Sequence, residues 1–291
     1  MILGAIEAGG TKFICAVGDE EGNIIEKVSF STTTPDETME NVIKYFKDKN
    51  IESLGIGSFG PIDPNKDSET YGYITTTPKK YWSNYNILGR LKESFDIPME
   101  FDTDVNGAAL GEVIWGSAKG TDNCLYITVG TGIGAGAVVE GKMLHGLSHP
   151  EMGHIFIARE EDDKFEGTCI YHKTCLEGLA CGPAIEERWG KKGNQLEEDH
   201  PCWDLEARYL AKALVNYILI LSPKKIIMGG GVMKQLQLFP LIRSYVKKYL
   251  NGYVSSNAIL KEIDNYIIPP GLGDNSGIKG ALALAKVATK N

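Results

Sequence analysis

A hairpin of two apolar strands joined by a glycine turn occurs twice in this chain. The first copy, ILGAIEAGGTKFICAVG, begins at Ile2, and the second, CLYITVGTGIGAGAVVEG, begins at Cys124. A third strand follows each hairpin after a short turn, and helices and further strands come after it. The two halves share little sequence, but their order of elements repeats. This repetition predicts two α/β domains with a cleft between them.

Hydrophobic spacing predicts the remaining elements. Apolar residues at helical spacing after Pro35 predict a helix there. Further helices are expected over residues 87–95, 105–116, 204–221, 233–250 and 276–288, and further strands over 54–60, 99–104, 224–231 and 266–268. Small and polar residues cluster at Gly116–Gly120. We therefore expect a first domain over residues 1–116 and a second over 117–276, with the last helix, within 277–291, packing back onto the first domain.

Charge and composition exclude several classes of function. The 291 residues carry a net charge of −8, and an acidic surface argues against binding to a phosphate backbone. No run approaches the roughly 18 apolar residues of a membrane span, and the N-terminus lacks the basic stretch of a signal peptide. We therefore expect a cytoplasmic protein that binds neither nucleic acid nor membrane. Cysteines are thiols or metal ligands in that compartment; Cys15 and Cys124 lie in apolar runs typical of a core, and Cys181 and Cys202 have no evident partner.

The two glycine turns are candidate phosphate-binding loops. Each pairs glycine with threonine, as Gly10–Thr11 and as Thr131–Gly132. Glycine also makes ordinary tight turns, so one such loop alone would indicate little. Two at equivalent places favour phosphate binding, because backbone N–H groups at such turns form anion-binding nests.

Two competing nucleotide motifs do not fit their context. GAVVEGKM nearly matches a P-loop, but Met143 stands where a Ser or Thr must hold Mg²⁺, and the segment lies in a hairpin. The glycines from Gly130 onward fit a relaxed dinucleotide fingerprint, which requires a helix next. The following residues AVVEG read as a strand instead.

Asp104 is the candidate general base. In FDTDVNGAALGE it stands where a strand meets a helix. A capping aspartate is the structural alternative. A carboxylate at the carboxyl end of a strand could also orient an acceptor hydroxyl and take its proton. The two roles are compatible.

The segment from His149 to Glu177 contains a candidate metal site. Cys169, His172 and Cys175 recur every third residue, and a structural zinc site takes four ligands. His154 is the expected fourth ligand and His149 an alternative, while chance clustering without metal is the third interpretation. Two thiolates and two imidazoles favour Zn²⁺ and leave no position for water, so the metal should be structural. It would hold a charged loop in place, and with it the carboxylates Glu151 and Glu177.

These motifs together resemble the ROK family of sugar kinases and repressors, most closely its bacterial fructokinase branch. The resemblance rests on EAGGTK, FDTDVNGAALGE, LYITVGTGIGAG, HPEMGHI, CIYHKTCLEGLACGPAI, IIMGGGV and GDNSGIKGALALA, and it spans nearly the whole chain. It implies an actin-like (ribonuclease-H-like) two-domain ATPase fold with a zinc-stapled loop over residues 150–177. It also implies use of ATP and Mg²⁺ and phosphorylation of a hexose at its 6-position.

The resemblance assigns roles residue by residue. Asp104 is the base. The sugar-binding positions are Thr103, Asp104, Glu151, His154 and Glu177, and His154 is also a zinc ligand with Cys169, His172 and Cys175. The positions that hold the nucleotide are Gly9, Gly10, Thr11, Lys12, Thr131, Gly132, Pro183, Gly229, Gly230, Gly231, Val232, Met233 and Lys234.

Three departures from the family pattern stand out. Glu7 occupies a position where the family usually has Asp, which puts the length of its contact to Mg²⁺ in doubt. Thr103 stands where the family usually has Asn, and a hydroxyl offers less reach than an amide. This change puts glucose in doubt as the preferred sugar. The zinc spacing C-x₂-H-x₂-C is also less rich in cysteine than is common in the family.

We therefore expect an ATP:D-fructose 6-phosphotransferase, a fructokinase that works as a homodimer on a small hexose and ATP. Glucokinase and mannokinase are the rivals within the enzyme class. A sugar-sensing repressor is a weaker alternative, because repressors carry a DNA-binding segment before the first hairpin, which here starts at residue 2. An actin-like ATPase would leave the loop with Glu151 and Glu177 unexplained.

Overall fold

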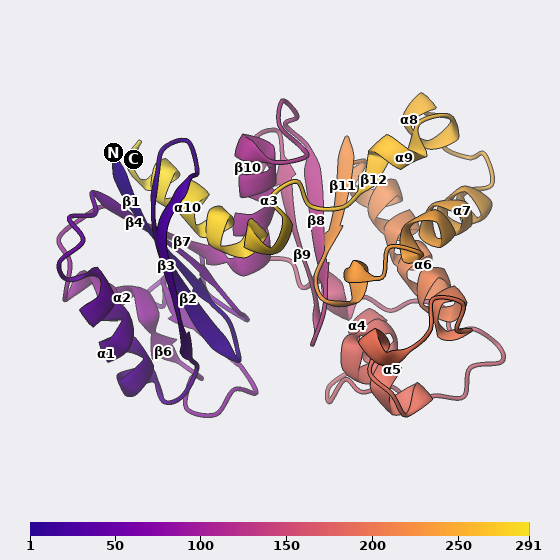
Figure 1. The fold of residues 1–291 in the computed structure, drawn as a ribbon, viewed down its shortest axis with the longest axis horizontal. Helices are drawn as coiled ribbons and strands as arrows, with labels where there is room; N and C mark the ends of the chain where they lie inside the picture. Colours follow the sequence, from indigo (N-terminus) through magenta and orange to yellow (C-terminus); the bar gives the residue numbers. More distant parts are fainter. Residues whose placement is uncertain (291) are drawn as a thin grey trace. The chain divides into compact units, whose positions relative to one another are not determined.

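The computed structural model describes residues 1–290, and in them each of the two hairpins anchors a five-stranded sheet (Figure 1). The first sheet has the order β3-β2-β1-β4-β7, and the second has the order β10-β9-β8-β11-β12. In each sheet the first strand of the hairpin lies in the middle, with its hairpin partner and the third strand on one side and the last two strands on the other. This shared order confirms the repeated α/β arrangement that the sequence predicts.

The strands of the first sheet are β1 (Ile2–Ala8), β2 (Lys12–Asp19), β3 (Ile24–Ser31), β4 (Ser53–Ser58) and β7 (Met99–Thr103), and those of the second are β8 (Cys124–Val129), β9 (Ile133–Val139), β10 (Lys142–Met143), β11 (Lys225–Gly229) and β12 (Ile267–Ile268). A small ribbon pairs β5 (Tyr73–Ile74) with β6 (Tyr85–Asn86). The α-helices are α1 (Pro35–Phe46), α2 (Ile87–Lys92), α3 (Asp104–Trp115), α4 (Leu176–Ala180), α5 (Gly182–Trp189), α6 (Cys202–Leu221), α7 (Leu238–Leu250), α8 (Asn257–Leu260), α9 (Ile263–Tyr266) and α10 (Ser276–Ala288). Single 3₁₀ turns occur at Met152–His154, Gly193–Gln195, Val232–Lys234 and Gly273–Asn275.

The described chain divides into two compact units. Unit 1 contains residues 1–120, residues 136–150 and the segment from Gly271 onward, and unit 2 contains residues 121–135 and 151–270. These limits differ from the expected domains chiefly because residues 136–150 group with unit 1. The backbone N–H of Ala137 donates to Asn106 Oδ1 at 3.1 Å, and the N–H of Ile62 donates to His149 Nε2 at 2.9 Å. Such contacts are remote in sequence and leave no local signal.

In unit 1, side chains alternate between two cores on opposite faces of the sheet. Ile6 and Phe13 point to the face covered by α1 and α2, while Leu3, Ala5 and Ala16 point to the face covered by α10 (Figure 1). Alternation is expected because successive strand residues point to opposite sides. Helix α1 begins after the N-cap Thr34, whose side chain accepts from the Glu37 N–H.

Glycine allows α3 and α10 to approach closely. A Cβ added at Gly280 would lie 2.3 Å from the carbonyl carbon of Gly107, and one added at Gly111 would lie 3.1 Å from Gly280. The first separation is too short for any side chain. Glu112, a fully buried carboxylate on α3, holds the segment that leads into α10. It accepts hydrogen bonds from the N–H groups of Gly271 and Leu272.

In unit 2, the long helices α6 and α7 pack against each other. The apolar residues of α6 are buried along one face, which includes Trp203, Leu210 and Leu214. The expected helix from Met233 is shorter than predicted, since Val232–Lys234 form a separate 3₁₀ turn and α7 begins at Leu238. The expected helix over 87–95 likewise ends at Lys92.

All six cysteines are buried, and over residues 1–290 none forms a disulfide. Among the helices that the structure describes, none is long and apolar enough to cross a membrane.

Candidate functional site

The junction of β7 and α3 holds Asp104. Asp104 is the first residue of α3, and its Oδ1 accepts from the N–H of Val105 at 2.9 Å. The N-cap is Thr103, whose hydroxyl oxygen accepts from the Asn106 N–H at 3.1 Å. The interpretation of Asp104 as the capping residue is therefore wrong. Both residue types favour N-caps, and the chain places the threonine in the extended conformation that a cap requires.

The first glycine turn joins β1 to β2 in unit 1. The Gly9 N–H donates to the Lys12 carbonyl at 3.0 Å, and the Thr32 hydroxyl donates to the Gly9 carbonyl at 2.7 Å. No atom lies within 4 Å of where a Gly10 Cβ would be. Hydrogen bonds at Gly9 therefore hold the turn in place, while its tip at Gly10 and Thr11 is open, with Thr11 exposed.

Glu7 lies on β1 just before this turn. Burial raises the pKa of its carboxyl, and the nearby Lys12 and Lys27 partly oppose that rise. A Cβ at Gly277 would lie 2.4 Å from the Glu7 carboxyl carbon, so glycine at the start of α10 leaves room for this side chain. A buried carboxylate of this kind is stabilised by a cation.

Several residues predicted to bind the nucleotide lie near the second glycine turn, in unit 2. The Gly182 N–H donates to the Gly130 carbonyl at 2.7 Å, which ties the turn to the start of α5 and to Pro183. A Cβ at Gly130 would lie 3.8 Å from the Gly231 nitrogen, and Gly230 has a φ of +92° with Val129 directly behind it. The structure thus brings the Thr131–Gly132 turn, Pro183 and the segment Gly229–Lys234 to one side of unit 2.

Glu177 connects this turn to the cysteine-rich loop. Its Oε2 accepts from the Ile133 N–H at 2.9 Å, and a Cβ at Gly132 would lie 2.5 Å from the same oxygen. A side chain at position 132 would therefore displace this carboxylate from the Ile133 N–H. The other oxygen, Oε1, lies 3.9 Å from His154 Nε2.

Four side chains of the cysteine-rich loop converge on one point. The donor atoms of His154, Cys169, His172 and Cys175 all lie within 4.8 Å of one another. His154 Nδ1 lies 3.7 Å from Cys169 Sγ and 3.5 Å from Cys175 Sγ, and His172 Nδ1 lies 3.8 Å from Cys169 Sγ. The alternative ligand His149 is not in this group and belongs to unit 1, where it accepts the N–H of Ile62.

The geometry of this group fits a tetrahedral metal. Zn–S bonds near 2.3 Å and Zn–N bonds near 2.0 Å place tetrahedral ligand atoms about 3.4 to 3.8 Å apart. The three separations above lie at or close to this range. Burial raises the pKa of the Cys175 thiol to about 12, because a lone thiolate there would lack solvation. A bound cation would supply the missing charge compensation.

The same loop positions Glu151. The His154 N–H donates to the Glu151 carbonyl at 3.0 Å within the 3₁₀ turn. A Cβ at Gly153 would lie 1.6 Å from the Ile133 carbonyl oxygen, so the turn sits directly against β9. The Tyr217 hydroxyl donates to the Met152 carbonyl at 2.5 Å. The backbone that carries Glu151 and His154 is therefore held by its contact with β9 and by the hydrogen bond from Tyr217 of α6.

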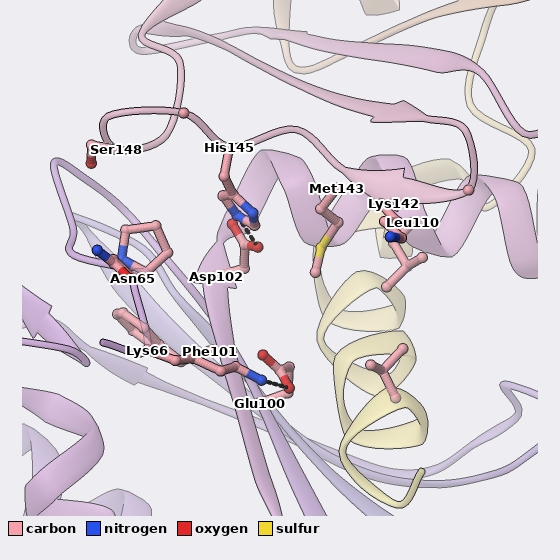
Figure 2. Close-up of a pocket in the computed structure, with 14 residues that line it drawn as sticks. Asn65, Lys66, Glu100, Phe101, Asp102, Leu110, Lys142, Met143, His145 and Ser148 are labelled. Carbon is pink, nitrogen blue, oxygen red and sulfur yellow. Dashed lines mark hydrogen bonds and ion pairs between the residues drawn. The ribbon is translucent and has the colours of Figure 1, made fainter. Parts of the chain in front are cut away.

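A pocket of about 600 Å³ in unit 1 involves residues that the sequence did not single out (Figure 2). Its wall includes Glu100 and Asp102 of β7. Glu100 Oε2 lies 2.8 Å from Lys66 Nζ, and Asp102 Oδ2 lies 2.7 Å from His145 Nε2. The hydrogen bond that His145 makes to the Asp102 carboxylate raises the pKa of His145. None of the site residues predicted from the sequence lines this pocket. Alternation along β7 could have indicated Asp102, but His145 carries no local signal.

The fold and these groups place the chain in a known class of proteins. The family model described as "ROK family" matches residues 3–288, and the chain belongs to this family. The chain is 58% identical to a provisionally named fructokinase of Bacillus subtilis (strain 168), over 99% of this chain and 96% of that protein. It is 50% identical to a fructokinase of Pediococcus pentosaceus over the full length of both. Among solved structures, the ROK hexokinase from Thermus thermophilus matches with a TM-score of 0.81 and 25% identity, covering 100% of this chain and 99% of that one.

Proposed function

We propose that this chain is an ATP-dependent fructokinase that forms fructose 6-phosphate. The observation that carries the proposal is the 50% identity to a fructokinase over the full length of both chains. The duplicated fold with two glycine turns and the carboxylate at the β7–α3 junction agree with a sugar kinase.

Asp104 is the proposed general base. Its place at N1 of α3 keeps the carboxylate near the positive end of the helix, which favours the ionised form. The hydrogen bond from the Val105 N–H holds one carboxylate oxygen of Asp104, and the carboxylate would accept the proton of the sugar hydroxyl. Phosphoryl transfer requires little covalent chemistry from the protein, so holding this base in line is its main task.

The two glycine turns, one in unit 1 and one in unit 2, are proposed to bind phosphate groups. Bound ATP supplies the phosphoryl group, and Mg²⁺ shares its negative charge. In unit 1 the open tip at Gly10–Thr11 would hold phosphate oxygens, with Lys12 beside it and Glu7 facing the cation. In unit 2 the backbone at Thr131–Gly132 would do the same, and Pro183 and Gly229–Lys234 would hold the adenosine part.

The loop with the four converging side chains is proposed to hold the sugar. Glu151, His154 and Glu177 would bind hydroxyl groups, and Thr103 would limit the sugars accepted. A structural Zn²⁺ on His154, Cys169, His172 and Cys175 would fix this loop without taking part in the chemistry. Because Glu177 lies beside His154 Nε2, it would also orient the ring of this ligand.

Sugar-dependent release of ADP tests the proposal. Purified protein with ATP and Mg²⁺ should release ADP at a substantial rate only when a hexose is added, and the sugar product with fructose should be the 6-phosphate. Rapid ATP turnover without any sugar would instead favour an actin-like ATPase. A protein that binds hexose but never turns over ATP would favour a sugar-sensing repressor.

A further inference from the structure

A buried carboxylate next to the proposed base holds the β7–α3 junction together. Asp102 is 1% exposed and accepts three hydrogen bonds. Its Oδ1 accepts from the Thr103 N–H at 2.7 Å and from Asn106 Nδ2 at 2.9 Å, and its Oδ2 lies 2.7 Å from His145 Nε2. All of these groups belong to unit 1. Asp102 thus binds the last residue of β7 and the first turn of α3, on either side of Asp104.

This network continues beyond the junction. Asn106 Oδ1 accepts from the Ala137 N–H at 3.1 Å, so the amide that Asp102 orients also ties α3 to β9. His145 lies on the loop after β10 and reaches Asp102 across the pocket (Figure 2). Three separate segments are therefore held by one carboxylate.

His145 supplies one of the three hydrogen-bond partners of Asp102. A buried carboxylate is costly unless it is paired and fully hydrogen-bonded. Two of its three donors, the Thr103 N–H and the Asn106 amide, are neutral, and His145 is the partner that can carry a positive charge. Without His145, Oδ2 of Asp102 would lose its donor, and the side chain would turn towards the pocket. That movement would weaken its hold on the residues beside Asp104.

We infer that Asp102 and His145 are positioning residues for the phosphoryl transfer, which together fix the direction of the Asp104 carboxylate. The inference rests on the proposed function, because it assigns Asp104 as the base. His145 acts through Asp102 and need not contact the sugar or the nucleotide. Its side chain is 37% exposed in the pocket, so a small molecule could replace its ring.

Substitution of His145 tests this role. His145→Leu removes the donor to Asp102, and kcat for fructose should fall about 10- to 100-fold, since small misplacements of a reacting group cost this much. The KM values for fructose and ATP should stay near those of the wild type. His145→Gln, whose amide can still donate to Asp102, should keep most of the kcat. If His145→Leu does not fold, His145→Asn serves, because its shorter amide is polar but does not reach.

Two controls separate positioning from general stability. Lys66→Met removes the neighbouring ion pair with Glu100 in the same pocket and should leave kcat unchanged. Added imidazole should restore part of the kcat lost in His145→Ala, with no change in its thermal midpoint.

The outcomes are distinct. A wild-type kcat in His145→Leu or its substitute overturns the inference. So does a loss that His145→Gln shares fully and that imidazole does not restore. If the wild-type protein itself shows no sugar-dependent ATP turnover, the proposed function fails instead.

Discussion

At the scale of single residues, the account depends most on Asp104. Asp104→Asn keeps the size of the side chain and leaves the Thr103 cap in place, but it removes the proton acceptor. We expect kcat to fall about 10²- to 10⁴-fold, the range typical of a lost general base. ADP release with saturating fructose measures the effect.

Asp36→Asn is the matched control for this change. Asp36 also lies in the first turn of a helix, α1, and is exposed. Its substitution should leave turnover unchanged. Near-normal turnover in Asp104→Asn, with an unchanged thermal midpoint, would contradict the assignment of the base.

Glu206 on α6 gives a second prediction at this scale. It is 2% exposed, and its Oε1 has no hydrogen-bond partner among the described residues. Burial raises the pKa of this carboxyl well above 4.5, and Arg188 opposes the rise only in part. Between pH 4.5 and the raised pKa, the folded protein keeps a proton that the unfolded chain has released. The free energy of unfolding therefore falls as pH rises through this interval.

Glu206→Gln removes this titration. The variant should gain stability relative to the wild type as pH rises above 4.5, by at most about 1.4 kcal/mol per pH unit for as long as Glu206 stays protonated in the folded protein. Thermal unfolding across this range measures the difference. Curves that stay parallel at all pH values would show that Glu206 does not titrate in the folded protein.

Residue-scale prediction from sequence has a clear limit in this chain. The motif FDTDVNGAALGE locates the strand–helix junction, but Thr103 and Asp104 are both good capping residues, so sequence alone did not separate them. The pairing of Asp102 with His145 joins residues 43 positions apart and depends on the tertiary fold. The four proposed metal ligands were easier to find, because three of them recur at a fixed short spacing.

At the scale of elements, the cysteine-rich loop should bind about one Zn²⁺ per chain. Cys169→Ser, Cys175→Ser, His172→Ala and His154→Ala should each lower the zinc content measured on the purified protein. Metal loss should weaken fructose binding more than ATP binding, because the loop carries Glu151 and Glu177. His154→Ala should reduce activity most, since it removes a ligand and a proposed sugar contact together.

His149→Ala is the informative comparison for the metal site. His149 contacts Ile62 in unit 1, so this variant should keep its zinc. If zinc is retained in His154→Ala but lost in His149→Ala, the fourth ligand is His149 and not His154. Full activity in a metal-free protein would remove the proposed role of the metal.

The contact between α3 and α10 gives a stability prediction. Gly280→Ala gains about 1 kcal/mol in helix propensity. The added Cβ would meet the Gly107 carbonyl carbon at 2.3 Å and the Ala108 nitrogen at 2.5 Å, and backbone atoms cannot rotate away. Overpacking of this kind costs about 1 to 3 kcal/mol, and a cost near 3 less the propensity gain of about 1 leaves a net destabilisation of about 2 kcal/mol. Lys279→Ala on the same helix should change the free energy of unfolding little, and equal denaturation midpoints for the two variants would refute the close approach.

At the scale of the whole chain, the duplicated hairpin was the most informative sequence feature. The repeated hairpin predicted two α/β halves with the same order of elements, and the two sheets have equivalent strand orders. The limits of the compact units were harder to predict. Gly136 lies within β9, and no break in sequence marks it, yet a Cβ there would lie 2.3 Å from the Val105 carbonyl carbon, so this part of the strand groups with unit 1. Composition shifts mark linkers, whereas this boundary falls inside a strand.

The most direct test of the account is the ratio of kcat/KM for fructose to kcat/KM for glucose in the wild-type protein. Both are measured by coupled ADP release at the same concentrations of ATP and Mg²⁺, with mannose as a third sugar. The account predicts that fructose has the highest value, with glucose and mannose measurable but weaker, because the proposed sugar contact at Thr103 is a hydroxyl, which has less reach than an amide. A clear preference for glucose would contradict the fructokinase assignment while leaving the kinase assignment in place.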